Sequence, residues 1–172
     1  MTFRFPLVCA AALVLAACAS EPEPPFSNPT EGFDATDQTF VEGSPQDPNS
    51  LAYFQQTVGD RVLFEVDAST LTPQAREVLD LQADFLLRNM EYLAIVEGHA
   101  DEQGTREYNL ALGARRAASV RDHLVSRGIA SDRIRTVSYG KERPIQVCSN
   151  ESCYAQNRRG VTVLDAPIGG GA

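Results

Sequence analysis

The strongest constraint on this chain is a stretch rich in proline and acidic residues between positions 19 and 50. It holds seven acidic residues, no basic residue and six of the ten prolines in the chain. Low hydrophobicity, charge of one sign and frequent proline prevent a packed core and favour an extended, self-repelling chain. The sequence therefore predicts a tether here. Residues 51 onward, with sixteen acidic and fourteen basic residues, are left to form one nearly neutral domain.

Residues 1–17 have the pattern of an export signal. A basic start is followed by an apolar run at 7–17, which is well short of the roughly 20 residues of a membrane-spanning helix. The run ends in Leu15-Ala16-Ala17-Cys18, which resembles the lipobox of bacterial lipoproteins. The resemblance implies that the mature chain begins at Cys18, that this residue carries lipid, and that the lipidated tether spans 18–50. The alternative is an ordinary signal peptide cut at an A-x-A site around Cys18.

Two of the four cysteines are left for other roles, because Cys9 leaves with the signal and Cys18 is the acylation candidate. Cys148 and Cys153 can form a disulfide, since disulfides persist in exported proteins. The alternative is a metal site. Two cysteines five positions apart, with both histidines far away in the sequence, lack the usual ligand spacing. We therefore expect no metal and no cofactor.

The remaining chain alternates helical and strand-like patterns. Asn49 or Ser50 is expected to cap a short helix that ends near Val58, and Pro73 indicates the first turn of a second helix. The run Tyr92–Glu97 does not alternate, which predicts a central strand covered on both faces or nearly so. The other expected elements are strands at 61–66, 134–139 and 161–164, the second helix up to about residue 88, and a third helix at 108–127 that Gly128 ends.

This order is β-α-β-α-β, followed by a loop and a last strand. It predicts an α+β fold in which helices pack on one face of a small mixed four-stranded sheet. The domain is expected to span 51–166, and the Gly-rich residues 167–172 are expected to form a frayed tail.

The longest run of specific polar residues lies between Glu97 and Leu124, at a strand end and a helix start. Helical spacing places Leu112 and Arg116 on one face, and Asp101 in the preceding loop can fold back toward that face. One acidic and one basic group around a shallow pocket suit a zwitterion, with its ammonium against Asp101 and its carboxylate against the planar fork of Arg116. The alternative is an Asp101–Arg116 salt bridge that stabilises the helix terminus.

A family resemblance favours the ligand site. The segment contains Gly-His-Ala-Asp at 98–101, Tyr-Asn at 108–109, Leu-Gly at 112–113 and Arg-Ala at 116–117. This pattern resembles the peptidoglycan-binding motif of the OmpA-type C-terminal domain, and the segments 137–144 and 157–159 extend the similarity. With the lipobox and the tether, the whole chain resembles the peptidoglycan-associated lipoproteins of Gram-negative bacteria. The resemblance implies an OmpA-like domain.

The resemblance also implies roles for individual residues. Asp101 is expected to bind the free amino group of meso-diaminopimelate in the peptidoglycan stem peptide, and Arg116 is expected to bind its carboxylate. Two positions depart from the family pattern: Val66 stands where relatives have Phe in a Phe-Asp pair, and Ala100 stands where they usually have Thr. We expect altered bracing there and not loss of binding. The further residues expected at the site are Leu112, Asn109, Ala100, Val66 and Asp67.

Charge and motifs restrict the class of function. A formal charge of -8 with a single lysine argues against a nucleic-acid binder, because phosphate neutralisation needs clustered basic residues. His99 and His123 have no partners at a spacing that indicates a catalytic triad, so structural roles are expected for them and no enzyme activity for the chain.

The resemblance implies a noncovalent link between the outer membrane and the cell wall, with a role in envelope constriction at cell division. Residue 19 is Ala and not the Asp that retains many lipoproteins in the inner membrane, which implies an outer-membrane lipid anchor with the domain in the periplasm. The expected protein partners belong to the Tol system: TolB first, then TolA or other OmpA-type proteins. The alternatives are an OmpA-domain lipoprotein that anchors the wall without Tol partners, and a cell-wall hydrolase.

Overall fold

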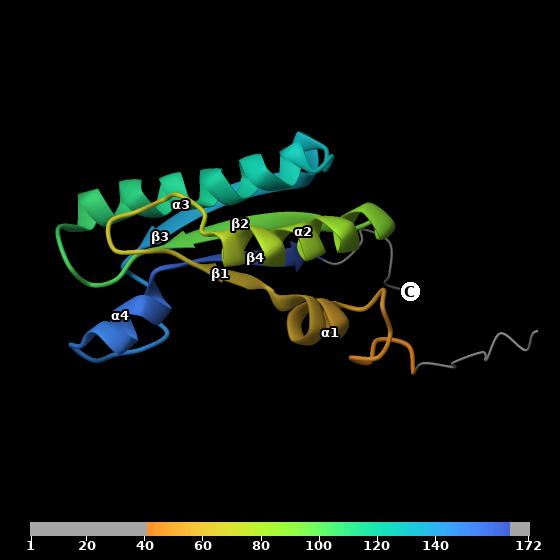
Figure 1. Cartoon of the computed structure of the whole chain (residues 1–172), viewed down its shortest axis with the longest axis horizontal. Coiled ribbons are helices and arrows are strands. Elements are labelled where there is room, and N and C mark those ends of the chain that lie inside the picture. Colours follow the sequence, from red (N-terminus) through yellow and green to blue (C-terminus); the bar gives the residue numbers. More distant parts are fainter. Residues whose placement is uncertain (1–40, 166–172) are drawn as a thin grey trace, which may run out of the picture. The chain divides into compact units, whose positions relative to one another are not determined.

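A computed structural model describes residues 41–165 of the chain (Figure 1). The predicted export signal, the Cys18 acylation site, the first part of the predicted tether and the predicted tail at 167–172 lie outside the described residues. Within 41–165, none of the helices has the length and apolar character that crossing a membrane requires. The elements are α1 (Leu51–Tyr53), η1 (Phe54–Gly59), β1 (Arg61–Leu63), α2 (Pro73–Arg88), β2 (Leu93–His99), α3 (Arg106–Ser126), η2 (Ser131–Arg133), β3 (Ile134–Gly140), α4 (Glu151–Asn157) and β4 (Arg159–Asp165).

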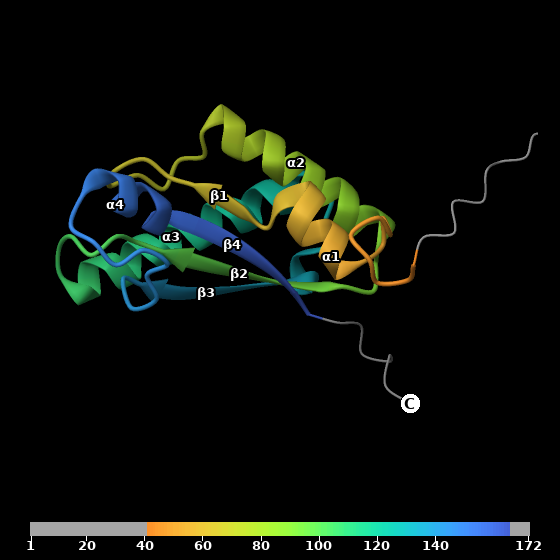
Figure 2. The same ribbon diagram turned by 90° about the horizontal axis from the view of Figure 1, so that it is seen from below.

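The strands form one mixed sheet in the order β1-β4-β2-β3 (Figure 2). β2 pairs in parallel with β3, and β4 runs antiparallel to both β1 and β2. The predicted α+β fold with a four-stranded mixed sheet is confirmed, and β2 is an interior strand as predicted. The expectation that β2 is covered on both faces or nearly so holds fully for one face and only in part for the other. Ala94 and Val96 are buried, but Leu93, Ile95 and Glu97 on the other face are only half-buried, because α2 and α3 both cover the same face of the sheet.

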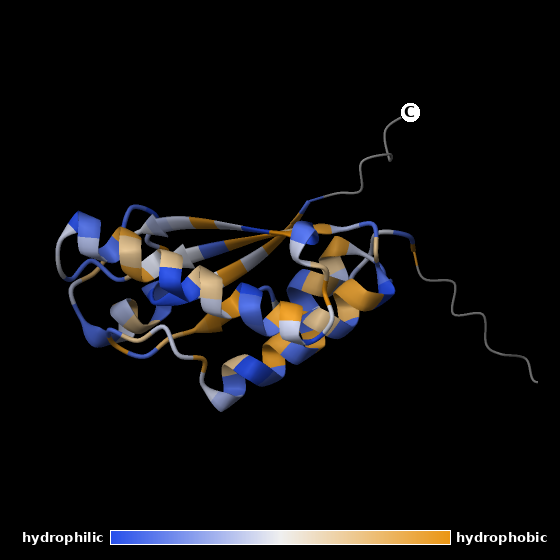
Figure 3. Ribbon diagram, turned by 90° about the horizontal axis from the view of Figure 1, so that it is seen from above, coloured by the Kyte–Doolittle hydropathy of each residue, from blue (hydrophilic) through white to orange (hydrophobic). Residues whose placement is uncertain are grey.

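The core lies between the sheet and these two helices. Thr72 caps α2 by accepting a hydrogen bond from the Ala75 N–H at 3.1 Å, and Pro73 occupies the first turn as predicted. Polar and apolar positions interchange along the helices and strands (Figure 3), which is the pattern of elements buried on one side. The largest fully buried apolar side chains are Phe54, Leu79, Phe85, Leu86, Val96, Val120, Leu124 and Ile129.

Two glycines let α3 approach the sheet closely. A Cβ atom on Gly98 would lie 1.8 Å from the carbonyl oxygen of Gly113, and one on Gly113 would lie 2.4 Å from Ser138 Oγ. The Ser138 hydroxyl donates to the Leu110 carbonyl oxygen at 2.6 Å, so the same contact is also hydrogen-bonded. The first half of α3 is therefore held directly over the ends of β2 and β3.

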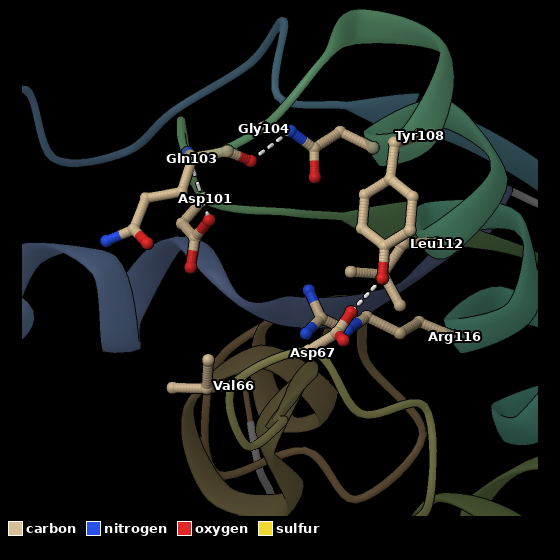
Figure 4. Close-up of a pocket in the computed structure, with 9 residues that line it drawn as sticks. Val66, Asp67, Asp101, Gln103, Gly104, Tyr108, Leu112 and Arg116 are labelled. Carbon is tan, nitrogen blue, oxygen red and sulfur yellow. Dashed lines mark hydrogen bonds between the residues drawn. The ribbon is translucent and has the colours of Figure 1, made fainter.

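β1 is shorter than the predicted strand at 61–66. The Phe64 N–H donates to the Arg158 carbonyl oxygen at 2.9 Å, and the chain then turns, with the Ala68 N–H donating to the Glu65 carbonyl oxygen at 3.2 Å. Asp67 has a φ of 54°, a left-handed conformation that a strand cannot contain. This turn directs Asp67 toward Tyr108 on α3, whereas Val66 lies farther from that helix (Figure 4).

The segment between β3 and β4, predicted as a loop, contains the helix α4. Asn150 caps it by accepting a hydrogen bond from the Cys153 N–H at 3.2 Å. Seven residues are too few to show a helical period in the sequence. Cys148 and Cys153 are joined by a disulfide, with their Cα atoms 6.0 Å apart.

Part of the predicted tether packs on the domain. Ser50 is buried, caps α1 and donates from its hydroxyl to the Ser44 carbonyl oxygen at 2.6 Å. The Tyr92 hydroxyl donates to the Asn49 carbonyl oxygen at 3.0 Å. The predicted short helix exists, but most of it is the π-helical turn η1. The folded unit therefore begins before residue 51 and includes at least Ser44–Ser50.

Candidate functional site

A pocket of about 260 Å³ opens where the turn after β1, the loop after β2 and the first turns of α3 meet (Figure 4). Both predicted charged residues, Asp101 and Arg116, contribute to it. The turn after β1 supplies one wall, and the β2–α3 loop supplies the opposite one. The lining residues are Val66, Asp67, Asp101, Gln103, Gly104, Tyr108, Asn109, Leu112 and Arg116.

Arg116 forms the floor of the pocket and is fully buried. Its guanidinium donates to three carbonyl oxygens: Nε to Ala68 at 2.8 Å, Nη1 to His99 at 2.8 Å and Nη2 to Glu65 at 3.0 Å. Burial lowers the pKa of Arg116 to about 10, although the nearby Asp101 opposes the shift, so the group stays charged at neutral pH. A guanidinium has five N–H donors, so two remain for an anionic ligand.

Asp101 is held by its own partners. Oδ2 lies 3.2 Å from Arg158 Nη1, and Oδ1 accepts a hydrogen bond from the Gln103 N–H at 3.1 Å. The predicted alternative, a direct Asp101–Arg116 salt bridge, is wrong, because Asp101 pairs with Arg158 and Arg116 donates to backbone carbonyls. A carboxylate has about four acceptor positions. The two that remain can receive a cation.

Other predicted residues lie where the sequence analysis expected them. Leu112 is buried and lines the pocket, and so does Val66, which is 60% exposed. The Asp67 carboxylate accepts a hydrogen bond from the Tyr108 hydroxyl, across the mouth of the pocket (Figure 4). Asn109 is buried, and its amide donates to the Gln103 carbonyl oxygen at 2.6 Å, so it shapes the β2–α3 loop.

Ala100 is the predicted site residue that does not line the pocket. It is buried, and its N–H donates to the Gly140 carbonyl oxygen at 2.8 Å, which extends the pairing of β2 with β3. The methyl group therefore packs inside the domain. Its effect on the pocket can only be indirect, through the backbone that leads to Asp101.

Four residues at the site were not expected: Tyr108, Gln103 and Gly104, which line the pocket, and Arg158, the partner of Asp101. Tyr108 could have been found, because it precedes Leu112 by four residues on the same helical face. Arg158 had no such signal, since 57 positions separate it from Asp101.

The two histidines lie outside the pocket. His99 is 1% exposed, stacks on Tyr139 with 5.5 Å between ring centroids, and has Nε2 3.4 Å from Glu97 Oε2. Burial, assisted by Arg159 and Arg143, lowers the pKa of His99 to about 4. His123 Nε2 lies 2.8 Å from Asp80 Oδ1 on α2. Within the described part of the chain, no three His, Cys, Asp or Glu side chains gather closely enough to hold a metal ion.

The model of the OmpA family matches residues 63–158, which is more than half of the chain. The chain belongs to the OmpA family. The matched region of this OmpA-family chain contains every residue that lines the pocket.

Two relatives have a name more specific than that of the OmpA family. The peptidoglycan-associated lipoprotein of Rhizobium meliloti (strain 1021) is 50% identical over 152 residues, which cover 88% of this chain and 82% of the relative. The protein of the same name from Mesorhizobium japonicum is 48% identical over 154 residues, which cover 90% of this chain and 87% of the relative. The predicted resemblance to peptidoglycan-associated lipoproteins is confirmed.

Solved structures agree with this assignment. The crystal structure of the peptidoglycan-associated lipoprotein from Burkholderia pseudomallei has a TM-score of 0.63 and 35% sequence identity, and the match covers 70% of this chain and 98% of that one. The C-terminal domain of Helicobacter pylori MotB, at 19% identity and a TM-score of 0.59, shares the fold.

Proposed function

We propose that this chain is an outer-membrane lipoprotein that binds peptidoglycan noncovalently and so links the outer membrane to the cell wall. The observation that carries the proposal is the pocket that holds Asp101 and Arg116 in a chain whose relatives are named peptidoglycan-associated lipoproteins. The function is binding and not catalysis. The expected load is mechanical, because the chain would join two layers of the envelope.

The proposed ligand is the zwitterionic end of meso-diaminopimelate in the stem peptide. Its ammonium would bind the free acceptor positions of Asp101, and its carboxylate would bind the two N–H groups that Arg116 has left. Leu112 and the Tyr108 ring would contact the aliphatic part. A volume of about 260 Å³ suits one amino-acid group and not a larger ligand.

The proposed anchor is lipid on Cys18. Because the folded unit includes Ser44, the linker available to the domain is the 25 residues at 19–43, which span 26 Cα–Cα steps from Cys18 to Ser44. Fully extended, it reaches about 85 Å. That length lets the domain bind the wall at a distance from the membrane surface.

The proposed test of the pocket is co-sedimentation of the domain with purified peptidoglycan sacculi. Asp101→Asn removes the charge but keeps an acceptor for the Gln103 N–H. The affinity of the domain for sacculi should fall by about tenfold or more, which corresponds to the loss of one charged hydrogen bond. The matched control is Asp84→Asn, at an exposed position on α2. Retention of Asp101→Asn equal to that of the wild type would contradict the site.

Ligand identity needs a second experiment. Stem peptides with diaminopimelate and with lysine at the third position should be compared, because lysine has the distal ammonium and lacks the distal carboxylate. Tight binding of the diaminopimelate peptide, but not of the lysine peptide, would support the assignment of Arg116 as the carboxylate site. Release of soluble fragments from the sacculi would favour the alternative of a cell-wall hydrolase.

We further propose that the protein works with the Tol system, with TolB as its chief partner and TolA or other OmpA-type proteins as further partners. The support is the relationship to the peptidoglycan-associated lipoproteins. Pull-down with purified TolB tests the assignment. A domain that binds sacculi but retains no TolB would instead be a wall anchor without Tol partners.

A further inference from the structure

The Cys148–Cys153 disulfide lies outside the pocket, but a series of polar contacts connects the two. None of the residues 148–158 lines the pocket. The Arg158 side chain, 5% exposed, directly follows α4 and is the centre of the connection. Nη1 lies 3.2 Å from Asp101 Oδ2, and Nη2 pairs with Glu151 Oε1 in the first turn of α4.

Arg158 also reaches the opposite wall. Its Nε donates to the Phe64 carbonyl oxygen at 3.2 Å, and the Phe64 N–H donates back to the Arg158 carbonyl oxygen at 2.9 Å. Phe64 directly precedes the turn that carries Val66 and Asp67 into the pocket. One buried guanidinium therefore connects the Asp101 wall to the Asp67 wall, and its orientation affects the distance between them.

A second contact connects α4 to the same loop. Asn157, the last residue of α4, is fully buried, and its Nδ2 donates to Glu102 Oε2 at 3.3 Å. Its Oδ1 accepts hydrogen bonds from the N–H groups of Ile145 and Gln146, at 2.9 and 3.1 Å. Asn157 and Arg158, at the C-terminal end of α4, thus contact consecutive residues of the β2–α3 loop, and Glu151 at the N-terminal end is joined to them through Arg158.

The helix that supplies these contacts needs support from elsewhere. A seven-residue helix is too short to be stable alone. The disulfide joins Cys148, which precedes the helix, to Cys153 in its first turns, and Cys153 is two residues from Glu151 and 9% exposed. The covalent bond restricts the segment that places Glu151 opposite Arg158.

We propose that the disulfide-linked helix α4 is a positioning element for the pocket. The disulfide holds α4, Glu151 on α4 orients Arg158, and Arg158 fixes the Asp101 carboxylate toward the ligand ammonium. The role in ligand binding depends on the proposed function. The positioning of Asp101 can be measured without any ligand, because the Gln103 N–H donates to Asp101 Oδ1.

The test compares the Cys148→Ser/Cys153→Ser double variant with Glu151→Gln, which keeps the disulfide and the shape of the side chain. Amide hydrogen exchange at Gln103 in the free domain reports on the position of Asp101, and binding of a diaminopimelate stem peptide reports on the pocket. Both variants should exchange faster at Gln103. Glu151→Gln should lower the affinity for the stem peptide by about two- to fivefold. The effect is modest because the Glu151 side chain of the Arg158–Glu151 ion pair is largely exposed.

Two further variants test the order of the contacts. Arg158→Lys keeps the charge but cannot contact Asp101, Glu151 and Phe64 together, so it should weaken stem-peptide binding by about tenfold. The matched control is Glu77→Gln, exposed on α2, which should leave both measurements unchanged. Combining Glu151→Gln with the cysteine variant should add little, because both act through the same contact.

The outcomes separate the two proposals. Wild-type exchange at Gln103 and wild-type affinity in both Glu151→Gln and the folded cysteine variant would overturn the positioning role. Faster exchange at Gln103 in a protein that does not bind the stem peptide at all would keep the positioning role and reject the proposed function. If the cysteine variant does not fold, Glu151→Gln decides the result alone.

Discussion

The Asp101 carboxylate pairs with Arg158, with 3.2 Å between Oδ2 and Nη1, and not with Arg116. The two arginines near the pocket therefore differ in their tasks. Arg158 orients the acidic group, whereas Arg116 binds three backbone carbonyls from the surrounding loops. Substitutions at these positions should have different effects, because Arg116 donates to three backbone carbonyls, whereas Arg158 pairs with two carboxylates and donates to one carbonyl.

Arg116→Ala should destabilise the domain. The carbonyl oxygens of Glu65, Ala68 and His99 would lose their donors inside the protein, so the free energy of unfolding should fall by about 3 kcal/mol or more. Urea unfolding followed by circular dichroism measures the change. Arg115→Ala, at the exposed neighbouring position, should stay within about 0.5 kcal/mol of the wild type. Equal stability of the two variants would contradict the scaffold role of Arg116.

Gly98→Ala should also destabilise the domain, by about 3 kcal/mol or more, through overpacking. The new Cβ would lie 1.8 Å from the Gly113 carbonyl oxygen, and α3 would have to move away from β2. Thermal unfolding tests this, with Ala114→Ser at an exposed position of α3 as the control. A Gly98→Ala domain that unfolds at the wild-type temperature would show that the contact between α3 and the sheet is adaptable.

His99 should make the stability of the domain depend on pH. Burial lowers its pKa from the usual 6.5 to about 4, so the unfolded chain binds a proton that the folded protein does not. Stability should therefore fall by up to about 3 kcal/mol as the pH falls from about 6.5 to about 4. Urea unfolding across this range measures the slope. The dependence of stability on pH should be weaker in His99→Phe, which keeps an aromatic ring on Tyr139. It should be unchanged in His123→Gln.

Arg133→Met should weaken the end of α2. The Arg133 guanidinium donates to the carbonyl oxygens of Leu86, Asn89 and Tyr92, at distances from 2.8 to 3.2 Å, just where α2 ends. Losing these charged hydrogen bonds should lower the free energy of unfolding by about 2 kcal/mol. Chemical unfolding gives the value, and Arg135→Met, exposed on β3, is the control. If the free energy of unfolding falls by a similar small amount in both variants, water replaces the donors that Arg133 supplies at the end of α2.

Cys18→Ala should prevent lipid attachment. The thiol of Cys18 is the proposed acylation site, so the variant should accumulate as an unmodified precursor. Mass spectrometry and membrane fractionation check this, with Cys9→Ala as the control that keeps the lipobox. A Cys18→Ala product that is still lipidated and membrane-bound would contradict the lipobox assignment.

Much of the fold could be predicted because its signals are local. Thr72 and Pro73 start α2 as expected, and Gly128, with a φ of 102°, follows the end of α3 where the sequence predicts a stop. The end of β1 and the helix α4 were not predicted. Asp67 takes a left-handed conformation that no neighbouring residue requires, and α4 is too short to show a period.

The sequence by itself determined the order of the strands and of the helices α2 and α3, and the placement of Leu112 and Arg116 on one helical face, because spacing and composition act over short stretches of chain. Only the tertiary structure decided which groups meet in the pocket. Arg158 lies 57 positions from Asp101, and Arg116 lies 51 positions from Glu65. Contacts at such separations arise from strand pairing and helix packing, which bring distant residues together without leaving a local pattern.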